Sequence, residues 1–271
     1  FLNNDTPAQA NWSDALKTSE LKGLVGGKSS LTHADLVAMF SAAEPANGSV
    51  SAAVVDDLQY LVKVSKSLLE PLGSVKADYL SYVLGQIVSG SLANKQFTGG
   101  GATPQNLGNL ATGMDKASFD KLWQSWLLGS DMPAPEFGGD SANPNAKPET
   151  GSYATYSEPL FTANGALATE VQQGGMGDCF LLAAMIAVAH TKPGHIESMF
   201  VDMGTYGGNR LWGVRFYDAD GKAVWVTVND KLPSADGSND RAKLMIGKSG
   251  DTSGEIWVPM LEKAYAQLNE T

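Results

Sequence analysis

The chain has 271 residues and a mass of 28.5 kDa, which is long enough for two domains. Its formal net charge of -10 argues against nucleic-acid binding through a basic patch, and no apolar run of about 18 residues predicts a membrane-spanning helix. Because the chain has one cysteine, no intramolecular disulfide can form, and the fold must depend on its core or on a metal.

Residues 1–129 are predicted to form an all-helical domain. Apolar residues recur at helical spacing in four segments, and these stripes are expected to be core. Thr32 and Asp35 resemble a capping box at the start of the first segment, and Gly129 is well placed to end the last. The apolar positions that define the helices are Leu36, Met39 and Phe40; Val54, Leu58, Leu61 and Leu68; Tyr79, Val83 and Ile87; and Phe119, Leu122, Trp123 and Trp126.

Residues 44–58, EPANGSVSAAVVDDL, invite comparison with a calcium-binding helix–loop–helix. With Gly48 at the sixth loop position, the first, third and twelfth positions are Ala43, Pro45 and Val54. None of these residues carries a carboxylate, and calcium needs several oxygen ligands. The sequence therefore argues against calcium binding in this loop.

Residues 130–158 differ in composition from the helical segment before them. They contain four prolines and three glycines and lack apolar periodicity. They are therefore predicted to be a linker or a long surface segment that is open to proteolysis.

Residues 159–271 are predicted to combine helices and strands. The run 181–189 is apolar all round and predicts a helix buried on every side. Residues 211–217 and 222–230 predict a two-stranded hairpin through an Asp-Gly turn. A last helix is predicted from the spacing of Trp257, Leu261, Tyr265 and Leu268. The whole chain is therefore assigned to the α+β class.

Residues 172–184, QQGGMGDCFLLAA, hold the single cysteine. A helix that starts near Gly177 or Asp178 would place Cys179 in its first turn, where the dipole and free N–H groups favour the nucleophilic thiolate. Gln173 has a side-chain amide that can donate to an oxyanion beside the backbone N–H of Cys179. On residue type alone, however, a lone cysteine ahead of an apolar run is more often a packed core residue.

The segment QGGMGDCFLLAA, from Gln173 to Ala184, resembles the active-site segment of the calpain family of cysteine proteases, whose pattern is Q-G-x-x-G-D-C-W-L-L-A-A. Phe180 is the one clear departure, since the family usually has tryptophan there. Residues 1–150 are not similar to any domain of the animal calpains, but they are weakly similar to the helical segment ahead of such cores in large bacterial proteins. Further matches, which extend the resemblance over residues 159–271 in family order, are Pro159-Leu160-Phe161 through Asn164-Gly165, Asn229-Asp230-Lys231-Leu232-Pro233, and Glu255-Ile256-Trp257 followed by Leu261-Glu262-Lys263-Ala264-Tyr265-Ala266.

The resemblance implies the first, helix-rich lobe of a papain-like and calpain-like protease core, with Cys179 as nucleophile and Gln173 as oxyanion donor. A cysteine protease also needs a histidine base that is oriented by Asn or Asp. None of His33, His190 and His195 is expected to be this base. His190 lies about 16 Å from Cys179 along one helix, at roughly 1.5 Å per residue. The family's His and Asn lie in a second lobe absent from this chain. The implied partners are that lobe and a protein or peptide substrate.

Animal members of the family bind calcium in this lobe through two backbone carbonyls and two carboxylates. Carried across by the resemblance, these ligands fall on Ala163, Gly165, Glu170 and Glu255. Glu170 replaces an aspartate and keeps the hard oxygen ligand that calcium requires. Ala168 stands where the animal enzymes have an arginine that helps align the lobes, which puts their activation mechanism in doubt here. The alternative is that the two glutamates are solvated surface residues.

The resemblance predicts a cysteine endopeptidase, expected to be bacterial, that acts through a Cys179 acyl-enzyme. Calcium activation and self-cleavage are further expectations, and residues 1–129 would be a propeptide or a positioning domain. The alternatives are a catalytically inactive calpain-fold module that binds calcium or acts in adhesion, and an acyltransferase that uses the same thiolate. Because the chain starts at Phe1, it is expected to be a processed or trimmed piece. Secretion from a bacterium is the predicted location, with a cytoplasmic location as the alternative.

Overall fold

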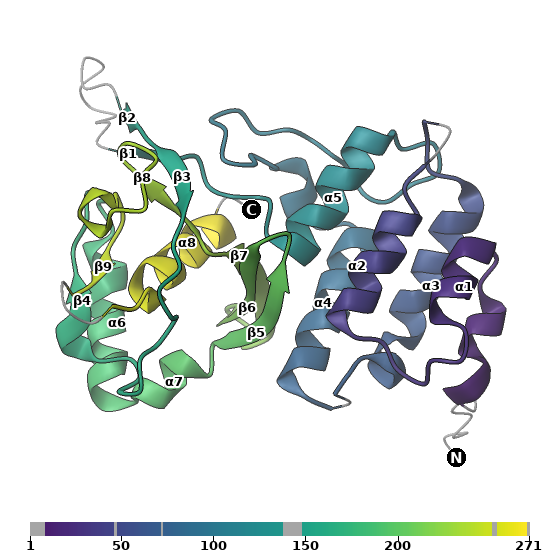
Figure 1. The fold of residues 1–271 in the computed structure, drawn as a ribbon, viewed down its shortest axis with the longest axis horizontal. Helices are drawn as coiled ribbons and strands as arrows, with labels where there is room; N and C mark the ends of the chain where they lie inside the picture. The colour runs from purple at the N-terminus through teal and green to yellow at the C-terminus, as the bar shows by residue number, and fades with distance from the viewer. Residues whose placement is uncertain (1–8, 46–47, 72, 138–147, 251–253, 270–271) are drawn as a thin grey trace. The chain divides into compact units, whose positions relative to one another are not determined.

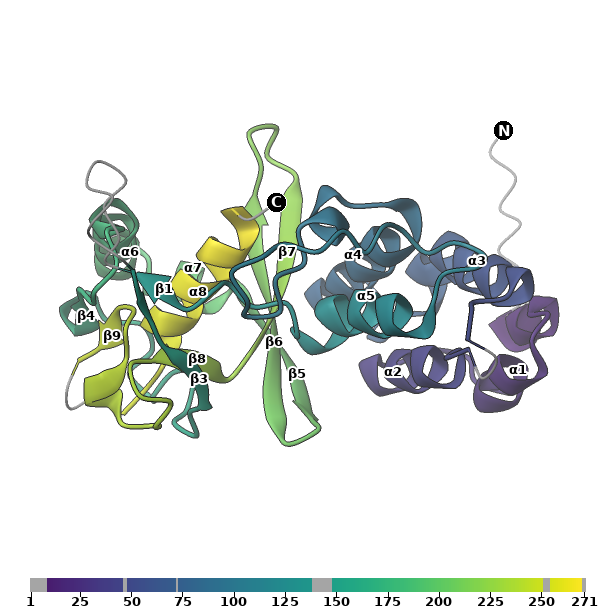
Figure 2. The same cartoon turned by 90° about the horizontal axis from the view of Figure 1, so that it is seen from above.

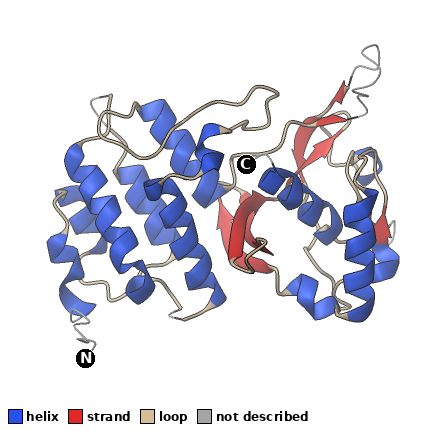
Figure 3. Ribbon diagram, turned by 180° about the vertical axis from the view of Figure 1, so that it is seen from behind, coloured by secondary structure: helices blue, strands red, loops and turns tan. Residues whose placement is uncertain are grey.

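The structure, a computed structural model, describes residues 9–45, 48–71, 73–137, 148–250 and 254–269 (Figure 1). The chain divides into a helical unit, residues 1–97 and 105–127, and a mixed unit, residues 98–104 and 128–271. All strands of the described residues lie in the mixed unit (Figure 3), which confirms the predicted α+β class. In the described ranges no helix has both the length and the apolar character that crossing a membrane requires.

The helical unit contains the predicted helices and some shorter ones. Its elements are η1 (Gln9–Ala15), α1 (Ser19–Val25), α2 (His33–Ala42), α3 (Ala52–Leu68), α4 (Val75–Ser89), η2 (Leu92–Lys95) and α5 (Lys116–Leu128). The capping box is present, because the side chains of Thr32 and Asp35 each accept a hydrogen bond from the other's backbone N–H. Leu36, Leu58 and Phe119 are fully buried, which confirms the apolar stripes as core.

The segment 44–58, which was considered as a calcium loop, is described except for residues 46 and 47, which lie outside the described residues. Ala43 and Val54, at its first and twelfth ligand positions, are buried apolar side chains. Val54 lies in α3, and its N–H donates to the side chain of the N-cap residue Ser51. The described part of the segment is therefore a capped helix start.

The mixed unit is built on a three-stranded antiparallel sheet in the order β5-β6-β7. Its strands are β1 (Glu136–Phe137), β2 (Glu149–Thr150), β3 (Ser152–Thr155), β4 (Val171–Gln172), β5 (Phe200–Tyr206), β6 (Asn209–Tyr217), β7 (Ala223–Asn229), β8 (Lys231–Ser234) and β9 (Lys248–Ser249). Its helices are η3 (Ala168–Glu170), α6 (Cys179–Thr191), α7 (Pro193–Glu197), η4 (Arg241–Lys243) and α8 (Trp257–Asn269). The predicted hairpin is β6 and β7, paired from Leu211 opposite Asn229 to Tyr217 opposite Ala223.

Helix α8 lies between α6 and the β5-β6-β7 sheet, as Figures 1 and 2 both show. Every residue from Trp257 to Ala264 is buried, so the first half of α8 runs through the core. Trp257 belongs to the same core cluster as Tyr156, Val214 and Val228. Side chains that α8 projects toward α6 are therefore held in fixed positions.

The prediction that residues 181–189 are buried on every side is wrong. Only three residues of α6 are buried, whereas Phe180 is 62% exposed and Ile186 is 41% exposed. An unbroken apolar run has no polar stripe that marks a solvent face, so the run alone cannot show how many sides are covered. One apolar face of α6 is left exposed.

The predicted linker, residues 130–158, contributes short strands to the mixed unit where it is described. β3 pairs with β8, with Ala154 opposite Leu232, and Tyr156 is fully buried just after β3. Strands of two to four residues are too short for apolar periodicity to reveal them. Residues 138–147 lie outside the described residues, and the domain boundaries stay predictions.

Candidate active site

Cys179 is the first residue of α6 and is exposed to solvent. The alternative in which it is a packed core thiol is therefore wrong. Backbone N–H groups in the first turn of a helix have no intrahelical acceptor, so they can donate to a negatively charged group placed there. The position thus suits a nucleophilic sulfur and an oxyanion that forms next to it.

The Gln173 side chain is held by the loop that leads into α6. Its Nε2 donates to the Met176 carbonyl at 2.6 Å and to Asp178 Oδ1 at 3.2 Å. Gly174 has no room for a side chain, because a Cβ there would overlap the backbone of Ile246. The amide predicted as oxyanion donor is therefore anchored close to the start of α6.

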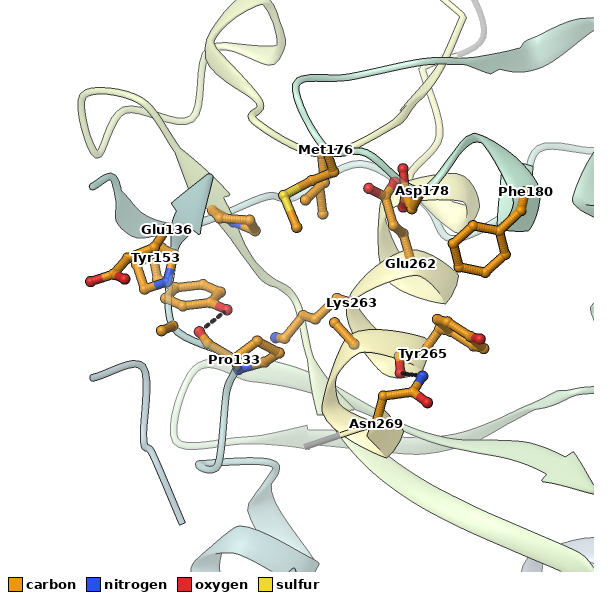
Figure 4. A pocket seen from close by; sticks show the side chains of 15 residues that line it. Pro133, Glu136, Tyr153, Met176, Asp178, Phe180, Glu262, Lys263, Tyr265 and Asn269 are labelled. Carbon is orange, nitrogen blue, oxygen red and sulfur yellow. Dashed lines mark hydrogen bonds between the residues drawn. The ribbon is translucent and has the colours of Figure 1, made fainter. Parts of the chain in front are cut away.

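Asp178 holds the N-cap position of α6, but its side chain makes no capping hydrogen bond. Instead its carboxyl group meets that of Glu262 from α8 (Figure 4). Glu262 is 3% exposed, and its Oε2 accepts a hydrogen bond from the Gly247 N–H at 2.5 Å. Burial, together with the hydrogen bond and negative charge of Asp178, raises the pKa of Glu262 to about 9. Glu262 is therefore protonated near neutral pH.

A cavity of about 360 Å³ lies beside this carboxyl pair. Apolar and aromatic side chains line most of it, including Met176, Phe180 and Tyr265. The Phe180 ring meets the Tyr265 ring edge-on, with 6.1 Å between the centroids. The cavity therefore extends from the first turn of α6, at Phe180, to Tyr265 of α8.

Lys263 also lines the cavity and is buried (Figure 4). Its Nζ donates to the carbonyl oxygens of Asn229 and Lys231 at 3.0 and 2.7 Å, and burial lowers the pKa of Lys263 to about 7. Sequence reasoning missed both Lys263 and Glu262 as site residues. Both residues lie outside the apolar stripe of the last helix, where charged side chains usually mark a solvent face, so the sequence held no signal that they would be buried.

Glu170 and Glu255, the two predicted calcium carboxylates, come together although 85 residues separate them. They are 8% and 0% exposed, so the alternative of solvated surface glutamates is wrong. Glu170 Oε2 accepts from Trp257 Nε1 at 3.1 Å, and Glu255 Oε2 accepts from the Thr162 N–H at 2.6 Å. Burial and the hydrogen bond with Glu170 raise the pKa of Glu255.

The donor set of this carboxyl pair fits calcium. Glu255 Oε1 is buried and has no hydrogen-bond partner among the described residues, and calcium prefers hard oxygen ligands. Gly165, a predicted carbonyl ligand with Ala163, has a φ of 69°, and a Cβ there would overlap Glu197. In the described residues no three His, Cys, Asp or Glu side chains cluster as a metal site. A cation beside Glu170 would therefore need backbone carbonyls as further ligands.

The described histidines do not supply a base at Cys179. His190 lies on α6, about 16 Å along the helix from Cys179 at 1.5 Å per residue, and His195 lies in α7 beyond the end of α6. His33 belongs to the helical unit, where its Nε2 lies 2.8 Å from the Leu127 carbonyl oxygen. Within the described residues, the Gln173 amide predicted as oxyanion donor is anchored next to the predicted nucleophile, without a general base.

A protein-family model described as "Calpain family cysteine protease" matches residues 150–271. Residues 150–271, the calpain segment, are therefore similar to that family. This calpain segment is 32% identical to calpain-8 of Mus musculus over 116 residues, 35% identical to the calpain-2 catalytic subunit of Homo sapiens over 117, and 34% identical to the calpain-1 catalytic subunit of Sus scrofa over 120. Each alignment covers 41 or 42% of this chain and 15% of the relative. The chain therefore spans a small part of the curated calpains that it matches.

The stability of the calpain segment should depend on pH through Glu262. Its pKa of about 9 in the folded chain exceeds its ordinary 4.5, so its stabilising contribution is complete below 4.5 and is lost as pH rises toward 9. Glu262→Gln keeps a neutral side chain at every pH. The unfolding free energy of the wild type minus that of Glu262→Gln should therefore fall by up to about 1.4 kcal/mol per pH unit between about pH 5 and 8. Denaturant titrations across this range measure the difference, and a constant difference would contradict a protonated Glu262.

Proposed function

We propose that the protein is a calpain-like cysteine endopeptidase in which Cys179 attacks the carbonyl carbon of a peptide bond. The observation that carries the proposal is an exposed thiol at the start of α6, next to the residue that anchors the Gln173 amide. The calpain match over residues 150–271 supports the same chemistry.

The reaction would proceed by covalent catalysis. The Cys179 thiolate forms a bond to the carbonyl carbon, and an electron pair of the carbonyl moves to its oxygen. That oxyanion accepts hydrogen bonds from the Cys179 backbone N–H and the Gln173 amide. The C–N bond then breaks, and the amine leaves with a proton from a histidine. Water hydrolyses the acyl-enzyme and regenerates the thiol.

The required His and Asn are proposed to lie on a second lobe outside this chain. The alignments to calpains cover 15% of those proteins, and the described residues contain no base at Cys179. The apolar face of α6 that includes Phe180 and Ile186 supports this proposal, because exposed apolar faces of this kind are typical packing surfaces. The partners would be that lobe and a protein or peptide substrate.

A peptidyl chloromethyl ketone should alkylate Cys179 in the full-length protein, because a bound peptide brings the electrophile to the nucleophile. Intact-mass spectrometry should show an adduct in the wild type that Cys179→Ala lacks. Gln173→Ala should keep the adduct but lower kcat for peptide hydrolysis by roughly 10²-fold or more, since one oxyanion donor is lost. Folded full-length wild-type protein without an adduct would contradict the proposal.

A catalytically inactive calcium-binding or adhesive module is a second candidate, favoured by the lack of a base at Cys179 in the described residues. It predicts retained calcium binding without an adduct. An acyltransferase would form the adduct but pass the acyl group to an amine. Product analysis on a peptide substrate separates this transfer from hydrolysis.

Calcium is proposed to bind between Glu170 and Glu255, with the backbone carbonyls of Ala163 and Gly165. The two buried carboxyl groups and the unpartnered Glu255 Oε1 support this proposal. Bound calcium would neutralise the pair and connect the loop before β4 to the chain just ahead of α8. Glu170 lies just ahead of the Cys179 loop in sequence, so the cation would fix the chain that leads into that loop.

Terbium, a luminescent substitute for calcium, should bind this site and be sensitised by Trp257, whose indole Nε1 donates to Glu170. Glu255→Gln should abolish the signal because it removes one of the two carboxylates. Glu149→Gln, at an exposed glutamate of β2, is the matched control and should keep the signal. Calcium should displace terbium and raise the unfolding temperature of the wild type. Equal luminescence in Glu255→Gln and the wild type would exclude this calcium site.

Self-cleavage within residues 130–158 is also proposed, because this segment is rich in proline and glycine. The helical unit would act as a propeptide or a positioning domain, and secretion from a bacterium stays a prediction. Full-length wild-type protein should show a new terminus that Cys179→Ala lacks. Identical termini would rule out self-cleavage.

A further inference from the structure

The N-terminus of α6 is left uncapped although it has a strong capping residue. An aspartate at the N-cap ordinarily accepts a hydrogen bond from a backbone N–H of the first turn. Ser51 of α3 and Ser74 of α4 do so, each accepting from the N–H three residues later. Asp178 of α6 does not. Its carboxyl group must therefore be held elsewhere.

The Asp178 carboxyl group is held by two side chains from outside α6, those of Gln173 and Glu262. Asp178 Oδ1 accepts from Gln173 Nε2 at 3.2 Å, and the same carboxyl group meets Glu262 of α8 (Figure 4). Glu262 Oε2 is occupied by the Gly247 N–H, while Oε1 is buried and has no donor among the described residues. Two carboxyl groups make such a contact when one proton lies between them. Because Glu262 is the more buried of the two, it holds the proton and donates to Asp178.

We infer that Glu262 is a positioning residue that keeps the Asp178 carboxylate turned away from the first turn of α6. The inference rests on the proposed role of Cys179 as nucleophile. If Asp178 capped α6, its negative charge would lie against the Cys179 sulfur and would occupy an N–H group of the first turn. With Asp178 turned toward α8, the helix end stays open, and the Gln173 amide keeps its anchor.

The rate at which iodoacetamide alkylates Cys179 tests this inference, because the chain has one cysteine. Glu262→Leu removes the donor, so Asp178 should turn to cap α6, and alkylation should slow by roughly three- to tenfold at neutral pH. Glu262→Gln still offers a donor to Asp178 and should restore the wild-type rate. Glu136→Leu is the matched control, since Glu136 lines the same cavity on the opposite side (Figure 4).

Asp178→Ala completes a double-mutant cycle. Its rate should equal or exceed that of the wild type, and adding Glu262→Leu should change it no further, because no carboxylate is left to reach the helix. A wild-type rate in folded Glu262→Leu, or an equal slowdown in the Asp178→Ala background, would overturn the inference.

Circular dichroism establishes that each variant is folded. If Glu262→Leu does not fold, Asp178→Ala still tests the inference. An alkylation rate of folded Asp178→Ala below that of the wild type would overturn it. Failure of the proposed function has a different signature, because the full-length protein would then form no adduct with the peptidyl inhibitor whichever residue stands at position 262.

Discussion

Helix α8 carries two ionisable side chains into the core of the mixed unit, and burial makes each of them dependent on hydrogen-bond partners. Lys263 donates to the carbonyls of Asn229 and Lys231, between β7 and β8. Glu262 accepts from Gly247 and meets Asp178 at the start of α6. These partners come from segments distant in sequence, so one helix sets their relative positions. The buried side chain of Glu262 therefore helps to fix the position of the candidate active-site loop through Asp178.

Two carboxyl pairs lie in the described part of the mixed unit, and Glu262 and Glu255 are their most buried members. In the Asp178–Glu262 pair, N–H groups of Gln173 and Gly247 occupy the outer oxygens, and a shared proton removes the remaining repulsion. Each pair keeps one buried oxygen without a hydrogen-bond partner among the described residues, Oε1 of Glu262 and Oε1 of Glu255. The pairs differ in their neighbours: Gln173 of the candidate active site donates to the first, whereas the second accepts from the N–H of Thr162, next to the proposed carbonyl ligands Ala163 and Gly165.

Helical periodicity predicted α2, α3, α4 and α5, and the Asp-Gly turn between two strand-like segments predicted the β6-β7 hairpin, because each pattern is local to its element. The covered face of α6 was not predictable, since the run contains no polar residue to mark the solvent side. The short strands before Tyr156 also escaped prediction, because they pair with segments such as β8 that lie far along the chain.

The sequence by itself determined the candidate nucleophile and its amide donor. Gln173 and Cys179 lie six residues apart in one glycine-rich loop, and that spacing, with the resemblance to calpains, needs no knowledge of the fold. Only the tertiary structure decided which acidic groups meet. Asp178 and Glu262 are 84 residues apart, and their contact depends on how α8 packs against α6. Local patterns record which face of an element is apolar, but they hold no information about which distant element will cover it.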